Sequence, residues 1–497
     1  MDVLIRYSGA KQAEADLCRS GSFHLVKRIS HQLTQQNVLV EKFVEFVYVN
    51  CQRPKCQIEL LSTSLLNTII EDALHNCTQA FCLKALDVIK IMIKLPEALD
   101  KLEHSIQTSP LTNLINYQKD HNILISTLEV IHILCKERKS LIESIVKTDN
   151  GITKISSVSA ISSKLKELSI DLFSLFVSQF SHFAHLIIDL PLELLECLMY
   201  KINLELAIKT QGLLKYLCKV PVVLKTLLER DKKGVLVLNV LEFLEDEKIE
   251  SNKKIEGINL LLVLITENKE LFAKVCEYSY LELSLSQCFL RSKEQLMPEI
   301  LIANCKVIIQ ILTYANNRNE QLKIQKLIAF STNRKVLEAI LSFIDKATLN
   351  NELELIKVLF DTLYSVFSFD VNIKAVIVQS VAKAIKEVVM KITEPCYELY
   401  KLCTFYVNDS EFDSYSLVDK EFIVKLMKCL KVKKIEMQEH LLTLVYTLSD
   451  NETFVKRMRE IIWENGLHYL IELYPKYREP ISYIMLKLSK VILYLHI

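Results

Sequence analysis

The sequence predicts an all-α protein, a right-handed α-solenoid of about ten three-helix repeats. Three observations predict this fold. Half of the 497 residues are hydrophobic, only seven are glycine, and apolar segments with helical spacing recur about every forty-two residues. A stack of helical units accounts for all three, because one unit cannot bury its apolar face alone and each added unit covers the one before it.

The composition argues against folds that depend on glycine. Average glycine usage of roughly 7% would supply several times as many glycines. Barrels, propellers and doubly wound sheets need residues that accept positive φ at their turns. A single core stops growing at about 250 to 300 residues, and no Pro-rich, Ser-rich or Gly-rich linker interrupts the apolar segments between Phe23 and Leu495. One continuous stack therefore fits better than several separate domains.

Charge and cysteine usage narrow the class of partner and the compartment. Sixty-one basic and sixty acidic residues give a formal net charge of +1, so nucleic acid is not an expected partner. The fourteen cysteines are scattered among apolar neighbours, as free thiols are in a reducing compartment, and the first residues lack a signal-peptide pattern. The apolar run 172–188 is too short and too polar to cross a bilayer, so no membrane insertion is expected. We expect a cytoplasmic or nuclear protein.

The repeat is the main signal in the sequence. Three segments with apolar residues at i, i+3, i+4 and i+7 start at Lys84, Ser126 and Leu168, each forty-two residues after the one before. Two columns keep this spacing, and they consist of Asp87, Glu129 and Asp171, and of Ile91, Ile133 and Leu175. Further long helices are expected at Thr210, Gly257, Cys305, Phe360, Tyr400, Leu441 and Ile481. We predict capping helices over residues 1–50 and the repeat solenoid over residues 51–497.

The junctions between these helices resemble those of the armadillo repeat family. In LSDNETFVKRMREIIWENGLHYLIELY (Leu448 to Tyr474), Ser449 and Asn451 follow a long helix, and Gly466 follows the next short one, as in that family. The segment 135–155 is similar, with Gly151 at the turn. Most other units lack this glycine, which leaves the subtype open between armadillo and the related HEAT repeat. The resemblance implies that the third helix of each repeat lines a concave, partner-binding groove.

The groove positions depart from the pattern of armadillo proteins that carry extended peptides. Those proteins present a ladder of Asn, often with Trp, whereas the matching positions here are mostly apolar or aromatic. The single tryptophan, Trp463, lies outside the long helices. This departure argues against recognition of basic nuclear-import signals. The matching positions are Ile91, Ile133, Leu175, Tyr216, Val263, Ser365, Phe405 and Thr447.

An apolar row flanked by Asp87, Glu129 and Asp171 suits an amphipathic partner helix with basic edges, or an extended segment, laid into the groove. A second interpretation rotates each helix by one position, so that the apolar row becomes core and the acids become ordinary solvated residues. Charge reversal of the three acids separates the two interpretations. Under the first, it weakens partner binding and leaves the melting temperature unchanged.

The sequence contains no motif for catalysis or cofactor binding. Patterns such as GxxxxGK[ST], GxGxxG, GxSxG and HExxH are absent. Cys51 with Cys56, and Cys77 with Cys82, lack a second matching pair or a nearby histidine, and buried thiols explain them better than a zinc site. We expect no enzymatic activity, no cofactor and no metal.

Three further features are candidate interaction or regulatory sites. Lys425, Lys428 and Lys431 recur every three residues along one helix edge, which either binds a phosphate or acidic partner or is a solvated face. Ser410 lies three residues before Asp413 in a polar loop, a context that suits phosphorylation, although most such loops are unmodified. The C-terminal helix is apolar and has no evident polar cap, which makes it a candidate contact for a homo-oligomer.

These observations favour a non-enzymatic scaffold or adaptor that holds protein partners along the concave surface of the solenoid. Two alternatives stay open, a nuclear transport or cargo receptor and a regulatory subunit of a multiprotein enzyme complex. Fold alone does not choose among them. Identification of a captured partner would choose among these functions. A GTPase, a catalytic subunit or a cytoskeletal protein would each favour a different one of the three.

Overall fold

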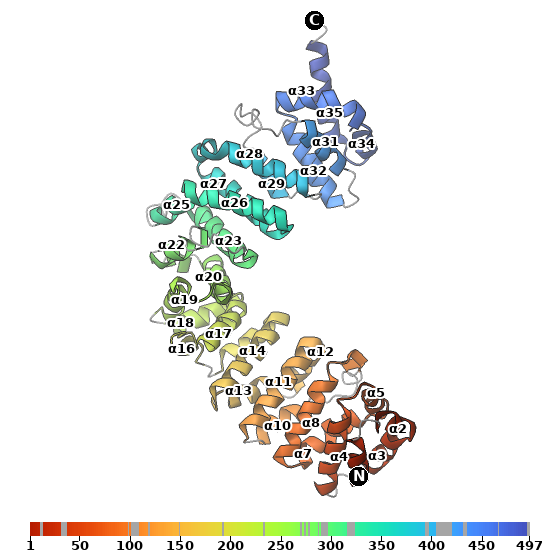
Figure 1. Ribbon diagram of the computed structural model, residues 1–497. Coiled ribbons are helices and arrows are strands. Elements are labelled where there is room, and N and C mark those ends of the chain that lie inside the picture. The colour runs from red at the N-terminus through yellow and green to blue at the C-terminus, as the bar shows by residue number, and fades with distance from the viewer. Residues whose placement is uncertain are drawn as a thin grey trace. The chain divides into compact units, whose positions relative to one another are not determined.

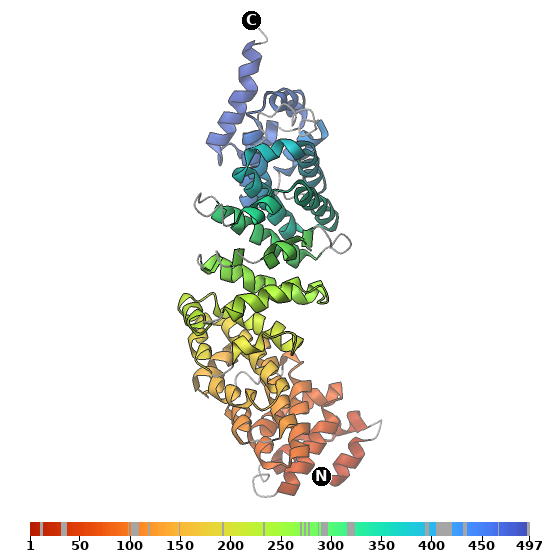
Figure 2. The same ribbon diagram turned by 90° about the vertical axis from the view of Figure 1, so that its left-hand side faces the viewer.

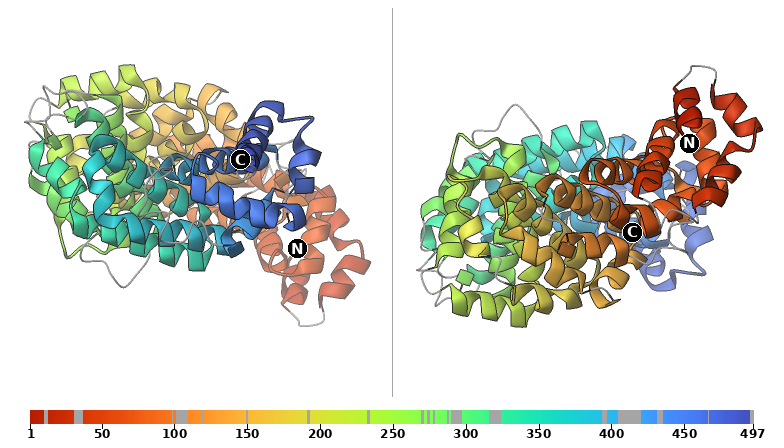
Figure 3. Two further views of the ribbon diagram at one scale, coloured as in Figure 1. Left: turned by 90° about the horizontal axis from the view of Figure 1, so that it is seen from above. Right: turned by 90° about the horizontal axis from the view of Figure 1, so that it is seen from below.

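The computed structural model is all-α, as the sequence predicts, because every regular element of its described residues is a helix, drawn as coiled ribbons in Figure 3. The structure describes residues 1–497 except for 10–12, 31–36, 98, 101–108, 118–119, 149, 191–192, 232–233, 269–270, 273–274, 277–278, 287, 290–296, 316–323, 393–396, 404–419, 431–434, 466 and 495–497. The chain divides into two compact units, residues 1–239 and 240–497. The helix α19 (Val235–Glu245) contains the boundary.

Long helices recur at nearly constant spacing in the first unit. They are α4 (Asn37–Asn50), α8 (Gln79–Met92), α11 (His121–Glu137), α14 (Ser163–Gln179) and α17 (Leu204–Leu217). Successive helices begin 42, 42, 42 and 41 residues apart and pack side by side in chain order (Figure 1). The predicted long segments at Lys84, Ser126 and Leu168 lie within α8, α11 and α14. The predicted period is therefore present, and it also includes α4.

Shorter helices form a second layer of the first unit, in which α7 packs on α10, α10 on α13 and α15 on α18. Figure 1 shows α7, α10, α13 and α18 along one edge of this unit. The remaining elements of the first unit are α1 (Asp2–Ser8), α2 (Ala13–Arg19), α3 (Ser22–Ser30), α5 (Pro54–Ser62), α6 (Leu65–Thr68), η2 (Ile69–Ala73), α7 (Leu74–Asn76), α10 (Ser109–Tyr117), α12 (Ser140–Glu143), η3 (Ser144–Thr148), α13 (Gly151–Ser159), η4 (Ser181–Phe183), α15 (Ala184–Ile188), α16 (Leu194–Cys197) and α18 (Pro221–Arg230).

The starts of the long helices share a capping position. Thr78, Asp120, Ser162 and Asn203 precede α8, α11, α14 and α17. The last three accept hydrogen bonds from backbone N–H groups of the first helical turn at 2.9 to 3.3 Å. Such caps satisfy donors that a helix start otherwise leaves unpaired. Polar residues forty-one or forty-two positions apart therefore cap α11, α14 and α17, whereas Thr78 makes no side-chain cap bond to α8.

The turn before α13 shows why a glycine is needed there. Asn150, not Gly151, has the left-handed backbone, with φ of 51°. A Cβ on Gly151 would lie 2.7 Å from the carbonyl oxygen of Ile145 and closer still to its Cγ2 atom. Gly151 therefore lies at the predicted turn. A glycine is needed there because a side chain would not fit, and not because the backbone requires a positive φ.

The second unit also contains a stack of helices, with less regular spacing, in which all but the seven-residue α29 are long. They are α20 (Ile255–Glu267), α23 (Pro298–Ala315), α27 (Leu353–Phe369), α29 (Tyr397–Cys403), α32 (Ile435–Leu448) and α35 (Arg478–Tyr494). Each packs on the next, and their starts lie 38 to 55 residues apart. The longest step, from α23 to α27, contains the 17-residue helix α26 (Arg334–Asn350).

A second layer runs beside these helices, in which α26 packs on α28, α28 on α31 and α31 on α33. In Figure 2 the green to blue segments of this unit follow one another in chain order. The remaining elements are η5 (Ser251–Lys254), α22 (Ser279–Ser286), α25 (Gln325–Ser331), η7 (Val371–Ile373), α28 (Lys374–Lys391), α31 (Lys420–Cys429), α33 (Glu452–Asn465) and α34 (Leu467–Leu473).

One helix of the described residues, α23, is long and apolar enough to cross a membrane by length and composition. It is weak evidence for a membrane span, since 56% of it is buried inside the fold and α20 and α27 pack against it. The apolar run 172–188 is not a single helix, because α14 ends at Gln179 and η4 and α15 follow.

Candidate protein-interaction face

The long helices of the first unit carry a row of half-buried apolar side chains, Ile91, Ile133, Leu175 and Tyr216, which we call the apolar row. Each is followed by a fully buried residue, and these buried residues are Met92, Leu134, Phe176 and Leu217. The apolar row therefore lies on the surface beside the core. The row is thus intermediate between the two interpretations, since it is less buried than the core and less exposed than a solvated surface.

The acidic column beside the apolar row is already paired within the protein. Lys90 Nζ lies 2.7 Å from Glu129 Oε2 and 4.0 Å from Asp87 Oδ1. Lys209 Nζ lies 2.6 Å from Asp171 Oδ2. The lysines thereby neutralise much of the negative charge that a basic partner would need, although the acidic side chains keep 30% to 51% of their surface exposed.

The acidic column has a fourth member that the sequence analysis missed. Glu45 on α4 stands forty-two residues before Asp87 and forms an ion pair with Lys84 on α8. The ion pairs of Lys84, Lys90 and Lys209 with acids on a neighbouring helix span 38 or 39 residues, about one helical turn less than the repeat. Counting back one period of forty-two residues from Asp87 would have identified Glu45 in the sequence.

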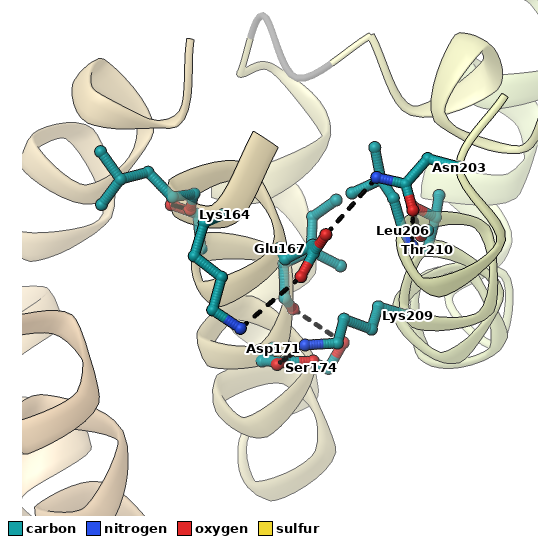
Figure 4. Close-up of polar contacts among 11 residues, drawn as sticks. Lys164, Glu167, Asp171, Ser174, Asn203, Leu206, Lys209 and Thr210 are labelled. Atoms are coloured by element: carbon teal, nitrogen blue, oxygen red, sulfur yellow. Dashed lines mark hydrogen bonds and ion pairs between the residues drawn. The ribbon is translucent and has the colours of Figure 1, made fainter. Parts of the chain in front are cut away.

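Asn203 connects α14 to α17 and was also missed. Its Nδ2 donates to Ser163 Oγ at 2.9 Å and lies 3.4 Å from Glu167 Oε1, while its Oδ1 caps α17. Figure 4 shows Asn203 reaching toward Glu167, and Lys209 meeting Asp171 further along the same two helices. A capping residue thus also fixes the register between neighbouring long helices.

Two lysines and a histidine lie close to members of the apolar row in the sequence. Lys215 Nζ and Lys219 Nζ lie 4.8 and 5.5 Å from the ring centroid of Tyr216, within range of a cation–π contact. On α11, burial lowers the pKa of His132, while the charge of Asp171 acts in the opposite direction. The imidazole is therefore mainly neutral near pH 7. We call these residues, the apolar row and the paired acids the long-helix face.

The other predicted site residues lie apart from this face or outside the described residues. Lys425 is half-buried and Lys428 is exposed on α31 in the second unit. Lys431, Ser410 and Phe405 lie outside the described residues. Among the remaining groove positions, Val263 and Ser365 are half-buried and Thr447 is 8% exposed.

Among the described residues, no group of three or more His, Cys, Asp or Glu side chains is placed to hold a metal ion. The thiols of Cys135 and Cys218 are buried next to the core, and burial raises the pKa of each to about 12. Such thiols are poor nucleophiles, because the reactive thiolate form is scarce at neutral pH.

Comparison with known proteins shows a fold likeness without a sequence match. No family model matches the chain, and no curated protein matches it. Among solved structures, an engineered protein is similar, with a TM-score of 0.57 and 12% identity over 86% of this chain and 97% of that one. Another is a chain from a study of a phosphorylation switch that controls the interaction between cadherin and β-catenin. It matches with a TM-score of 0.53 and 11% identity over 98% of this chain and 100% of that one. At these identities the likeness shows a shared all-α fold alone.

Proposed function

We propose that the protein is a non-enzymatic scaffold or adaptor whose armadillo-like repeats bind a protein segment along the long-helix face. The apolar row carries this proposal. Four successive long helices each present one half-buried apolar side chain at the same position, and such a row is suited to the apolar side of a partner. Its fourth member, Tyr216, is of a residue type that is frequent at binding hot spots.

The spacing of the row favours an amphipathic helix as the bound segment. Packed helices lie about 8 to 10 Å apart, and residues seven apart on a helix are separated by roughly 10.5 Å along its axis. A partner helix that crosses the stack would therefore place one apolar residue against each of the four repeats at i, i+7, i+14 and i+21. An extended segment would meet the same row about every third residue.

The internal pairing of the acids refines the partner's chemistry. Since Lys90 and Lys209 already neutralise Glu129 and Asp171, the partner gains little from basic edges. We therefore expect binding to depend mainly on apolar area and only weakly on salt concentration.

Two further observations support the class of function. A similar fold occurs in the cadherin and β-catenin structure, which concerns an interaction between proteins. The buried thiols Cys135 and Cys218 suit the reducing cytoplasm or nucleus, where we place this scaffold. The proposal includes no catalytic step and no cofactor.

The test is capture of partners from a cell extract on the full chain, followed by titration with the purified partner. Ile91→Glu, Ile133→Glu and Leu175→Glu should each weaken binding about tenfold or more, because each places a charge against an apolar contact. Ile202→Glu, at a residue that is 77% exposed away from the row, is the matched control and should bind normally. Equal affinity of all four variants would reject the proposal.

The identity of the captured protein also separates the related functions. A catalytic subunit whose activity changes on binding would make this chain a regulatory subunit. A transport GTPase or a released cargo would make it a carrier. In both cases the three glutamate variants should still reduce binding if the long-helix face is the contact.

A further inference from the structure

Two thiols meet where the N-terminal capping helices pack on the start of the repeats. Cys18 on α2 and Cys56 on α5 place their Sγ atoms 4.0 Å apart, although the residues are 38 positions apart in the sequence. The sequence analysis grouped Cys56 with Cys51 instead, but the thiol of Cys51 donates to the carbonyl oxygen of Tyr48 at 3.1 Å. The packing of α2 on α5, which lie side by side in Figure 1, therefore creates a thiol pair that spacing does not show.

The contact between α2 and α5 holds the two thiols in place. Glu14 Oε1 on α2 accepts a hydrogen bond from the backbone N–H of Lys55, in the first turn of α5, at 2.8 Å. This bond satisfies a donor that a helix start otherwise leaves unpaired. Ala13 and Leu17, on the same helix as Cys18, are 0% and 1% exposed. The approach of the two sulfurs is therefore set by a packed and hydrogen-bonded interface.

The two sulfurs are close enough to be joined with little movement. A disulfide places its sulfurs about 2.05 Å apart, so the Sγ atoms need to approach by about 2 Å. A change of χ1 rotamer moves a sulfur by a distance of this order. Cys18 is half-buried, so a small reagent can reach it, whereas Cys56 is 0% exposed. Cys18 is therefore the thiol that meets an oxidant, and Cys56 is the thiol that completes the bond.

We propose that Cys18 and Cys56 are a redox-sensitive pair, oxidised by a small-molecule disulfide to a bond that fastens α2 to α5. The Cys18 thiolate attacks one sulfur of the reagent, the bond between the two reagent sulfurs breaks, and one thiolate leaves. The Cys56 thiolate then attacks Cys18 Sγ and displaces the second reagent thiolate. The protein thereby loses two electrons and two protons, and the reagent is reduced to two thiols.

The surroundings of the pair make this oxidation slow near neutral pH. Burial raises the pKa of both thiols, and that of Cys56 reaches about 12. The charged groups near the pair are Glu14, Arg53, Lys55 and Glu59. Because the thiolate is the reactive form, the reaction should accelerate as the pH rises. In a reducing compartment such a pair rests as thiols and is oxidised only transiently.

The bond would change the stability of the N-terminal end. The helix α2 packs on α1 and α3 as well as on α5, so it connects the capping helices to the first repeat. Helices at the end of a stack open more readily than those within it, because they have a neighbour on one side only. A cross-link between residues 18 and 56 restricts the unfolded chain between them. Oxidation therefore holds the cap closed. This inference does not depend on the function proposed for the long-helix face.

The experiment treats the reduced full chain with glutathione disulfide, alkylates the remaining thiols and maps the peptides by mass spectrometry without reduction. Cleavage after Lys55 and Glu59, by trypsin and a glutamate-specific protease, separates Cys56 from the other cysteines. The expected product is a peptide pair joined through Cys18 and Cys56 that dithiothreitol separates. Amide hydrogen exchange in α2 and α3 should slow at least about tenfold in the oxidised protein.

Cysteine variants make this result specific. Cys18→Ser and Cys56→Ala should each abolish the cross-link and the slower exchange. Cys77→Ser is the matched control, since Cys77 is also half-buried and a hydrogen bond with the thiol of Cys82 raises its pKa. This variant should form the cross-link at the wild-type rate.

The peptide map of the wild type decides the proposal without any variant. Absence of the cross-link between Cys18 and Cys56 would overturn it, whether Cys18 stays reduced or is recovered only as a mixed disulfide with glutathione. A cross-link between Cys77 and Cys82 alone would do the same. Unchanged hydrogen exchange in α2 of the fully cross-linked protein would also overturn it.

Discussion

Replacement of Asn203 by alanine tests how the long helices are held in register. The amide makes two kinds of contact, since Oδ1 caps α17 through Leu206 N at 3.0 Å and Nδ2 donates to Ser163 Oγ at 2.9 Å. Loss of a helix cap costs about 1 kcal/mol, and loss of one hydrogen bond costs about 1 kcal/mol. We therefore expect Asn203→Ala to destabilise the first unit by about 2 kcal/mol.

A double-mutant cycle separates the two contributions. Ser163→Ala removes only the interhelical acceptor, so the cycle of Asn203→Ala with Ser163→Ala should give a coupling energy of about 0.5 to 1.5 kcal/mol. Asn203→Asp keeps the cap but replaces the amide donor with a carboxylate near Glu167, and should cost the interhelical hydrogen bond together with the repulsion between the two carboxylates. Asn122→Ala, in the first turn of α11 and exposed, is the matched control and should change stability by less than about 0.5 kcal/mol.

The assay must resolve local stability, because repeat proteins need not unfold in a single step. Amide hydrogen exchange in α14 and α17, measured with urea unfolding of the full chain, gives this resolution. Protection should fall in α17 of Asn203→Ala and remain unchanged in α8. A coupling energy below about 0.3 kcal/mol would refute the interhelical role of the amide.

Two further predictions concern Gly151 and His132. Gly151→Ala should destabilise the first unit by about 1 to 3 kcal/mol in urea unfolding, because the added Cβ would meet the backbone of Ile145. A gain in stability, as helix propensity alone predicts, would contradict this. Burial lowers the pKa of His132 in the folded state, so the unfolded state takes up the proton first as pH falls below about 6.5. Stability should decline from about pH 7 to about pH 5, and His132→Gln should flatten this decline in thermal unfolding; parallel curves for both proteins would disprove it.

The sequence was sufficient to predict the helical class and the repeat in the first unit. The long segments at Lys84, Ser126 and Leu168 lie within helices that begin at the same spacing. This succeeded because helix stacking requires an apolar face on every unit, and that requirement appears as a local period. The residues that precede the long helices, Thr78, Asp120, Ser162 and Asn203, recur at nearly the same spacing. They could also have been found from the sequence, although the sequence analysis did not use them.

The chemistry of the candidate face depended on contacts between helices. The half-burial of Ile91 and Ile133 follows from helix rotation, which the sequence left open between two registers. The pairing of Lys90 with Glu129 and of Lys209 with Asp171 joins residues 38 or 39 positions apart on separate helices. A local pattern predicts which residues share a helix face, but not which side chain of a neighbouring helix reaches them.

The amino-acid sequence by itself thus determined that this protein is a series of amphipathic helices with a period of forty-two residues in its first half, because propensity, capping and apolar spacing act within one helix at a time. Only the tertiary structure decided that the acids of the long-helix face are neutralised and that the thiols of Cys18 and Cys56 meet between α2 and α5. Both depend on the distance between side chains of different helices, which packing sets.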